Sequence, residues 1–230
     1  SGYRRNSSVP PTKEEERAPE KADLEERPEF TVFVQTKQQF EMVLGKFKMY
    51  RKLSERSYGI YLAAESFDAQ EWKKLADRCH EVGVRCYLMM PRIFRKEAEQ
   101  YFRKQMELLT SAGFDALGIG SMEEPGFLRE AGIELPMYFD QGMYSWNHLA
   151  GAAMERYGAD RLTIPVELNE REIRDSGVQG EMIVYGYLPM MISAQCIRKT
   201  TLGCSGKSEI MWLKDRKDMR FPVVNQCRFC

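Results

Sequence analysis

Four cysteines lie in the last 35 residues of this 230-residue chain, and they are the side chains best suited to bind a metal or cluster. Their spacing places two in Cys-IRKTTLG-Cys and two in a final Cys-Arg-Phe-Cys: Cys196, Cys204, Cys227 and Cys230. Metal thiolate sites use four ligands around one centre, and two local pairs joined by a hairpin would supply them. The spacing leaves zinc and a four-iron four-sulfur cluster both open, with unpaired or disulfide-bonded cysteines as the alternative.

Carboxylates form the second set of chemical side chains. Glu65, Asp140 and Glu167 each follow a short apolar run that reads as a strand, and Gln35, Arg92 and Tyr185 occupy similar positions. In a parallel barrel the active site lies at the carboxyl ends of the strands, so these side chains would face the mouth. A helix cap or a loop ion pair is the alternative role for each. Glu181 begins its run, so we expect it at the opposite end, in a structural role.

The two histidines argue against a conventional protease. His80 lies on a charged helical stretch and His148 begins another helix, so we expect surface and structural roles. A serine or cysteine nucleophile needs a base beside it, and the sequence contains no His-Glu-x-x-His motif of a zinc protease.

Basic residues surround the tail cysteines. They outnumber the nearby acids Glu209, Asp215 and Asp218, and a local positive field of this kind could contact RNA phosphates or a protein substrate. A solvated hairpin face is the alternative. The basic residues are Arg198, Lys199, Lys207, Lys214, Arg216, Lys217, Arg220 and Arg228.

The order of apolar runs and amphipathic stretches predicts the elements that hold these side chains. Seven strands are expected, over 31–36, 60–64, 85–91, 115–120, 135–140, 161–167 and 181–186, with a helix after each of the first six. This alternation indicates an α/β fold with a parallel sheet, and we favour a (β/α) TIM-like barrel, complete or nearly so, over an open doubly wound sheet. A hairpin is expected from Ile210–Leu213 and Phe221–Val224.

Composition adds further expectations. Residues 1–29 are charged and proline-rich and predict a flexible linker, followed by a barrel over 30–190 and a cysteine-containing segment over 191–230. The net charge is +0 and no run of 18 apolar residues occurs, so we expect no membrane span. Six cysteines are too few for a disulfide scaffold, and a reducing cytoplasm is expected. The termini read as those of a piece or module of a longer chain.

The C-terminal part resembles the U32 peptidase family, the collagenase-like proteins. Its signature combines a Glu, an apolar run, a Gly, and then a cysteine pair with Gly before the second cysteine. The residues that match this signature are Glu181, Gly186, Cys196, Gly203, Cys204 and Ser205. Upstream, Asn147, Glu167 and Leu168 match, and the tail matches at Leu213, Asp215, Arg216, Phe221, Pro222, Val223 and Cys227. The sequence departs from many members at Pro189, where they carry a cysteine.

The resemblance implies a barrel-like fold and one of two activities. Some relatives are labelled peptidases of unknown catalytic type, and others are similar to hydroxylation factors with a four-iron four-sulfur cluster on four cysteines. We therefore expect cluster ligands at Cys196, Cys204, Cys227 and Cys230, pocket residues at Glu167, Asp140 and Asn147, and hydroxylation or modification of RNA or another substrate. A collagenase-like hydrolase and a non-catalytic zinc-stapled module are the alternatives.

Overall fold

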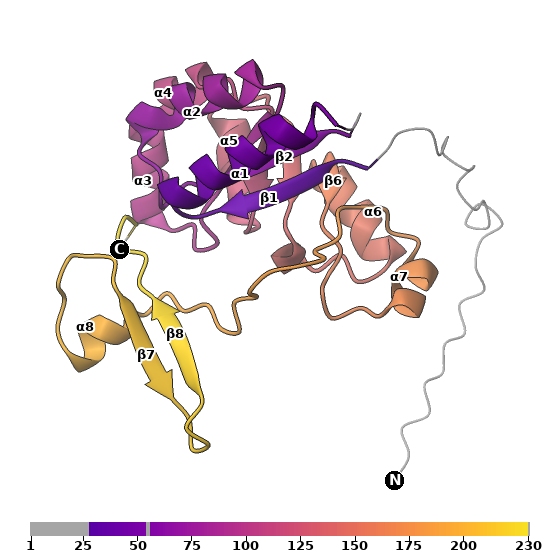
Figure 1. Cartoon of the computed structure of the whole chain (residues 1–230). Coiled ribbons are helices and arrows are strands. Elements are labelled where there is room, and N and C mark those ends of the chain that lie inside the picture. Colours follow the sequence, from indigo (N-terminus) through magenta and orange to yellow (C-terminus); the bar gives the residue numbers. More distant parts are fainter. Residues whose placement is uncertain (1–27, 54–55, 230) are drawn as a thin grey trace, which may run out of the picture.

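The computed structural model describes residues 28–53 and 56–229. The predicted linker over 1–29 therefore lies almost wholly outside the described residues. Strands and helices alternate from residue 30, and a separate group of elements ends the chain (Figure 1).

One curled sheet carries the fold. Its six strands are all parallel and follow one another in sequence order, as predicted from the alternation of apolar and amphipathic stretches. The strands shorten along the chain from six or five residues to two. They are β1 (Phe30–Val34), β2 (Tyr58–Ala63), β3 (Arg85–Met89), β4 (Ala116–Ile119), β5 (Met137–Phe139) and β6 (Arg161–Leu162).

Helices connect successive strands and cover the outer face of the sheet (Figure 1). The single helix expected between the strands over 85–91 and 115–120 is two helices that meet at Gln105. Gly158 and Gly177 end α6 and α7 in the left-handed conformation that glycine tolerates best. The helices are α1 (Lys37–Tyr50), α2 (Ala69–Glu81), α3 (Lys96–Lys104), α4 (Met106–Ser111), α5 (Glu123–Glu130), the 3₁₀ helix η1 (Gln141–Met143), α6 (His148–Tyr157) and α7 (Glu170–Ser176).

The main core lies between this sheet and the helices. Alternate strand residues such as Ile60, Leu62 and Leu88 point outward and are fully buried against helix residues that include Trp72 and Phe102. Burying one such side chain contributes about 1.5–3 kcal/mol, so this layer supplies most of the driving force for folding.

The inner face of the sheet carries aromatic and polar side chains instead. Tyr61 and Tyr87 lie 4.7 Å apart between ring centroids, and Tyr138 packs edge-on against Tyr87. Below them, toward the amino ends of the strands, the carboxylate of Glu29 accepts a hydrogen bond from Tyr87 and pairs with Arg161 at 2.8 Å. Polar and aromatic groups, rather than layers of aliphatic side chains, therefore fill this interior.

The sheet does not close into a complete barrel in the part of the chain that the structure describes. The prediction of a seventh strand over 181–186 is wrong: only Glu181 makes a bridge, to Thr163, and the following residues are exposed. A physical reason lies in β6, which pairs for two residues only. Pro165 follows with no N–H to continue a ladder, so β6 offers a seventh strand little to pair with.

The last elements form a small unit beside the sheet. α8 (Ile197–Thr201) precedes the antiparallel pair β7 (Ile210–Lys214) and β8 (Arg220–Val224), which stand apart from the six-stranded sheet (Figure 1). Asp215 shapes the turn between them, because its side chain accepts hydrogen bonds from the N–H groups of Lys217 and Met219.

Candidate functional site

The carboxyl ends of the strands bring together charged residues that are far apart in sequence. Glu65 follows β2, Arg92 follows β3, Gly120 follows β4 and Asp140 follows β5 directly. Because neighbouring parallel strands end at one edge of the sheet, these residues gather there. We call this group, with Ser121, Glu124 and Gln141, the barrel mouth.

An ion pair spans the barrel mouth. Arg92 donates to Asp140 across 2.6 Å, and Asp140 also accepts a hydrogen bond from the backbone N–H of Gln141. Arg92 lies against two glycines, since a Cβ at Gly120 would be 3.1 Å from its Cγ and one at Gly142 would be 3.4 Å from its Nη1. Burial raises the pKa of Asp140, and the charge of Arg92 opposes that rise.

Glu124 is the most deeply buried acid of the barrel mouth, with 0% of the residue exposed. One carboxylate oxygen accepts hydrogen bonds from the N–H groups of Gly120 and Ser121, at 2.7 and 3.3 Å. Burial raises the pKa of Glu124 well above its ordinary value, and the nearby charge of Glu65 adds to the rise. Burial likewise raises the pKa of Glu65, against the charges of Arg228 and Arg92. These are the environments in which carboxyl groups act as acids or bind ligands.

Four buried polar atoms at the barrel mouth have no hydrogen-bond partner among the described residues. They belong to side chains that follow three different strands. The atoms are Oε2 of Glu65, Oε1 of Glu124, Oγ of Ser121 and Oε1 of Gln141. Buried polar atoms are normally paired, so such a group is a feature of a ligand site.

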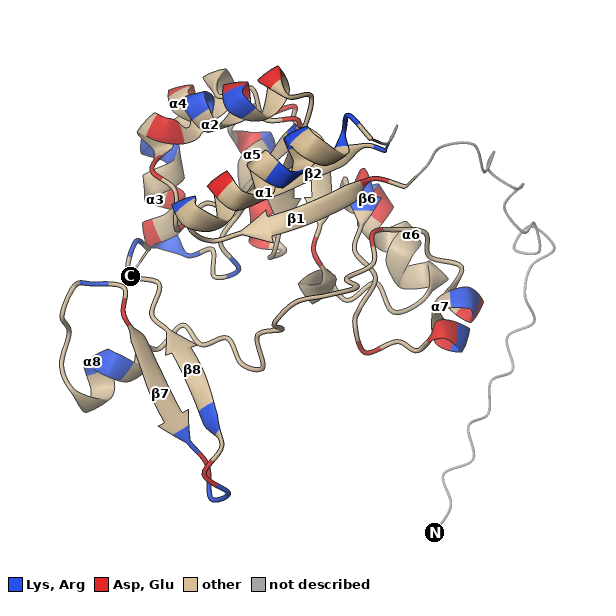
Figure 2. Ribbon diagram, viewed as in Figure 1, with Lys and Arg blue, Asp and Glu red and all other residues tan. Residues whose placement is uncertain are grey.

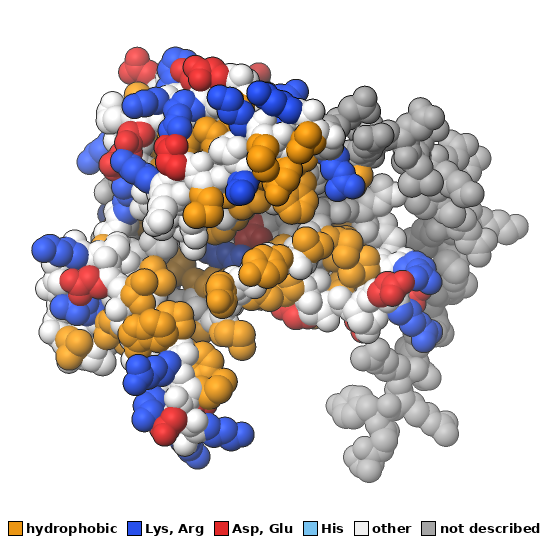
Figure 3. Space-filling model, in the orientation of Figure 1, with side chains coloured by type: hydrophobic (Ala, Val, Ile, Leu, Met, Phe, Trp, Pro, Cys, Tyr) orange, Lys and Arg blue, Asp and Glu red, His pale blue; other side chains and the backbone are white. Residues whose placement is uncertain are grey.

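Aromatic and apolar side chains lie close to the barrel mouth in sequence. Tyr144 and Trp146 follow η1, stack with an interplanar angle of 20° and are both exposed. The run from Met182 to Ile192 is exposed throughout, and Tyr185 and Tyr187 reach 95% and 105%. Figure 3 shows a hollow between the sheet and the lower part of the molecule, with charged atoms at its floor and hydrophobic side chains at its lower edge.

Glu181 occupies the gap between the first and last strands. Its carboxylate accepts hydrogen bonds from the hydroxyls of Thr31 on β1 and Tyr61 on β2. Its backbone bonds to Leu162 and Ile164 on the side of β6. Glu181 therefore connects β6 to β1 through its contacts, which is a structural role, as expected.

Three of the predicted cysteine ligands lie in the small C-terminal unit. Cys196 caps α8, and its sulfur accepts a hydrogen bond from the N–H of Lys199 and lies 4.0 Å from the side-chain oxygen of the buried Asn225. The N–H of Cys227 donates to Ser208, four residues after Cys204. The segments that carry these cysteines thus meet at the open end of the β7–β8 pair.

The residue after Cys227 anchors this unit to the main body. Arg228 pairs with Asp68 at 2.7 Å and donates hydrogen bonds to the carbonyl of Phe67 and the hydroxyl of Tyr101. Phe229 packs on Tyr101, with centroids 5.1 Å apart. Asp68 lies three residues after Glu65, so the end of the chain is held beside the barrel mouth. Cys230 lies outside the described residues.

The donor set fits a thiolate-held group in the type of its ligands. Cys196, Cys204 and Cys227 are free thiols on adjoining segments, and thiolates are the ligands that zinc and iron–sulfur clusters take. Across residues 28–53 and 56–229, no three His, Cys, Asp or Glu side chains are arranged to hold a metal ion. Binding would therefore require the sulfur atoms to move closer together, with Cys230 as the fourth ligand.

The other predicted site residues are more dispersed. Asn147 is the exposed N-cap of α6, where it accepts from the N–H of Ala150, and Glu167 is exposed in the loop after β6. Of the three predicted pocket residues, only Asp140 is at the barrel mouth. His80 is exposed and lies 2.9 Å from Asp115 through its Nε2, and His148 starts α6.

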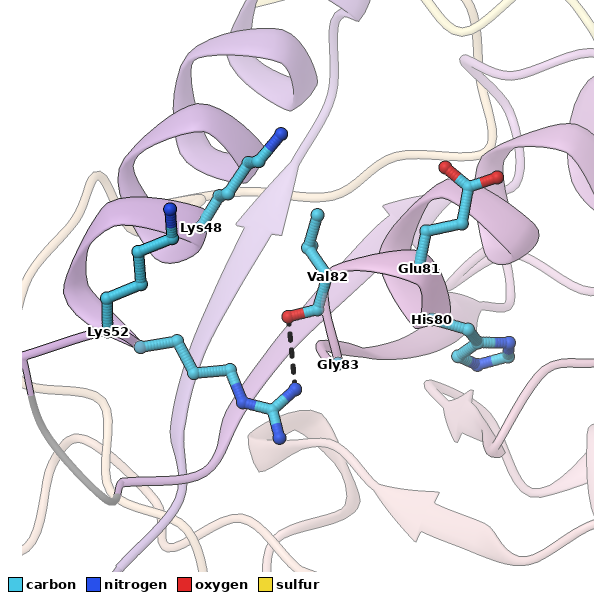
Figure 4. A pocket seen from close by; sticks show the side chains of 7 residues that line it. Lys48, Lys52, His80, Glu81, Val82 and Gly83 are labelled. Carbon is cyan, nitrogen blue, oxygen red and sulfur yellow. Dashed lines mark hydrogen bonds between the residues drawn. The ribbon is translucent and has the colours of Figure 1, made fainter.

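A surface depression lies at the opposite end of the sheet from the barrel mouth, where α1 and α2 end (Figure 4). Arg51 crosses it to donate to the carbonyl of Val82, and any side chain at Gly83 would collide with this arginine. The other charged and imidazole side chains that line it are all exposed, so this depression lacks the buried acids of the barrel mouth; they are Lys48, Lys52, His80 and Glu81.

The basic side chains of the tail concentrate at the turn between β7 and β8 (Figure 2). Three of the eight are in ion pairs: Arg198 with Glu209, Lys214 with Asp218 and Arg228 with Asp68. The turn keeps a local positive charge from Arg216, Lys217 and Arg220.

Sequence reasoning missed Glu124 and the anchoring role of Arg228. Glu124 lies in the charged first turn of a helix, and such a sequence predicts a solvent-exposed side chain. The one sequence feature that could have indicated its burial is its position four residues after Gly120, at the end of a strand. The contact between Arg228 and Asp68 joins residues that no local pattern connects.

A comparison with protein families shows which family this chain belongs to. The family model described as "Peptidase family U32" matches residues 51–208. The chain belongs to peptidase family U32. The match includes the barrel mouth, Glu181, Cys196 and Cys204, whereas Cys227 lies beyond its end. No curated protein matches this U32 chain.

Solved structures resemble this U32 protein only distantly. Muconate lactonizing enzyme from Pseudomonas putida has 11% identity and a TM-score of 0.41, over 58% of this chain and 37% of that chain. Thiamine phosphate pyrophosphorylase from Pyrococcus furiosus has 11% identity and a TM-score of 0.41, over 67% and 84%. The chain spans well under half the length of the first of these, and these likenesses carry no conclusion about function.

No helix in the described part of the chain has the length and apolar character needed to cross a bilayer.

Proposed function

We propose that this U32 protein bears a four-iron four-sulfur cluster and acts in the hydroxylation or modification of RNA or another substrate at the barrel mouth. The proposed ligands are Cys196, Cys204, Cys227 and Cys230. Such a cluster supplies electron transfer when bound.

One observation carries the proposal: the cysteine segments adjoin one another and are anchored beside the buried acids of the barrel mouth. The pairing of Arg228 with Asp68 holds Cys227 near Glu65, while Ser208 and Asn225 connect the other two segments. A redox group and a substrate pocket side by side are what cluster-dependent chemistry requires. The positive turn between β7 and β8 favours a polyanionic substrate such as RNA.

The test is metal analysis of protein purified without oxygen. A brown protein with about four iron and four sulfide per chain supports the proposal. Cys204→Ser should lose most of this iron, whereas the neighbouring Ser205→Ala should keep it. Stoichiometric zinc without iron would instead assign the zinc-stapled module, and a colourless protein free of both metals would overturn the proposal.

A hydrolase of the collagenase-like kind is the second candidate. It is favoured by Glu124 and Glu65, whose buried carboxyl groups have raised pKa values and resemble the acids that protonate a leaving group. Cleavage of gelatin that disappears in Glu65→Gln, in protein free of metal, would support this candidate over the first.

A further inference from the structure

The unpartnered atoms of the barrel mouth define what it can bind. Oε2 of Glu65, Oε1 of Glu124 and Oε1 of Gln141 are all acceptors when the acids are ionised, and all three are buried. Gln141 is evidence for a ligand site apart from the two acids, because it is an uncharged residue that is only 9% exposed. A ligand that satisfies these atoms must donate several hydrogen bonds.

The charges of the barrel mouth are unbalanced. Arg92 forms an ion pair with Asp140, and Arg228 forms one with Asp68. The carboxyl groups of Glu65 and Glu124 are left without an ion-pair partner among the described residues. Two buried carboxyl groups near one another are stabilised as carboxylates by a cation placed between them.

We propose that the barrel mouth binds an organic cation, a guanidinium or ammonium group, between Glu65, Glu124 and Gln141. This inference takes the barrel mouth as the substrate site, as the proposed function does, but needs no metal centre. A free amine or amidine and an arginine or lysine side chain of a peptide offer the same chemistry. The ion pair of Arg92 and Asp140 bounds the site, and the glycines at 120 and 142 keep that pair in place.

Proton release should accompany binding. Burial raises the pKa of both acids, and the charged groups around them are Arg92, Arg228, Asp140 and Glu123. A bound cation favours the carboxylate forms, so the affinity should rise as the pH rises toward the raised pKa values of these two acids.

The test compares two probes of the same shape, methylguanidinium and methylurea, by isothermal titration calorimetry. We expect methylguanidinium to bind at least about tenfold more tightly, because only it carries the charge. Glu65→Gln and Glu124→Gln should each weaken binding about tenfold, while Glu97→Gln, an exposed acid on α3, should not change it. Gln141→Met, which leaves both acids intact, is the second variant if either of the others fails to fold, and it should weaken binding a few-fold.

The outcomes distinguish a free cation from a peptide side chain as the ligand, and they distinguish this inference from the cluster proposal. Tighter binding of N-acetyl-argininamide than of methylguanidinium assigns the site to a peptide side chain, and the reverse assigns it to a free cation. Equal binding of methylurea, or no binding of either cation, overturns the inference. Measuring the same titration in Cys196→Ser distinguishes the two proposals, since loss of iron with unchanged cation binding leaves this inference standing.

Discussion

The carboxylate of Glu181 accepts a hydrogen bond from the hydroxyl of Tyr61 at 2.9 Å, across the gap that the six strands leave open. It also accepts from Thr31 on β1, while its backbone pairs with β6. Together with the ion pair of Glu29 beside β1 and Arg161 on β6, this residue links the two edges of the sheet, in the place where a seventh strand was predicted.

Glu181→Ala should lower the free energy of unfolding by about 2 kcal/mol, because it leaves two hydroxyl groups without their acceptor. Tyr61→Phe removes one of the two hydrogen bonds and should cost about 1 kcal/mol. Urea unfolding followed by tryptophan fluorescence measures both. Glu134→Ala, at an exposed site, is the control, and equal stability of Glu181→Ala and this control would show that the link contributes nothing.

The ion pair of Arg92 and Asp140 gives a second prediction. Arg92→Met would leave a buried acid without its cation, and we expect the free energy of unfolding to fall by about 3 kcal/mol. The double variant Arg92→Met, Asp140→Asn should recover part of this loss, because no unpaired charge remains. A double-mutant cycle in urea measures the coupling, and additive losses would mean that the two side chains act independently.

The first five strands were predictable, whereas the closure of the sheet was not. Strands β1 to β5 show short apolar and aromatic runs, and α2, α4 and α5 end near Gly83, Gly113 and Gly132. The run Glu181–Gly186 has the same local character, and its failure to form a strand depends on how far β6 extends. Pro165 ends that ladder. Whether two strands pair cannot be predicted from the sequence of either strand alone.

The candidate site was predictable in part for a similar reason. Asp140, Arg92 and Glu65 were found because they directly follow strands, which fixes their end of the sheet. Asn147 was expected in the pocket only from the family resemblance, and its side chain instead caps the N-terminus of α6. Glu124 was missed because its burial results from reaching back to the end of β4, a tertiary effect that the charged sequence around it conceals.

Glu124 predicts how stability depends on pH. A carboxyl group whose pKa is raised by folding binds more protons in the folded than in the unfolded chain above its ordinary pKa of 4.5. The free energy of unfolding therefore falls as the pH rises from there toward the raised pKa, by at most about 1.4 kcal/mol per unit. Glu124→Gln does not titrate, so its stability relative to the wild type should increase from pH 5 to pH 8, by thermal and urea unfolding. The exposed neighbour Glu123→Gln is the matched control, and parallel profiles for all three proteins would contradict the prediction.

Arg228 anchors the cysteine unit to the main body but is not a proposed ligand. Its anchoring role can therefore be tested separately from metal binding by the cysteines. Arg228→Met would remove the ion pair with Asp68 and the hydrogen bonds to Phe67 and Tyr101, so the last residues should detach from α2 and α3. We expect faster cleavage by trypsin and chymotrypsin in the segment after β8 and a loss of about 1 kcal/mol in unfolding free energy, since the pair is partly exposed. Arg216→Met, at the turn between β7 and β8, removes the same charge and leaves this anchor intact. If the cluster proposal holds, Arg228→Met should also lose iron faster to a chelator than Arg216→Met while keeping every cysteine. Equal iron loss and equal proteolysis in the two variants would show that the anchor does not hold the cysteine unit in place.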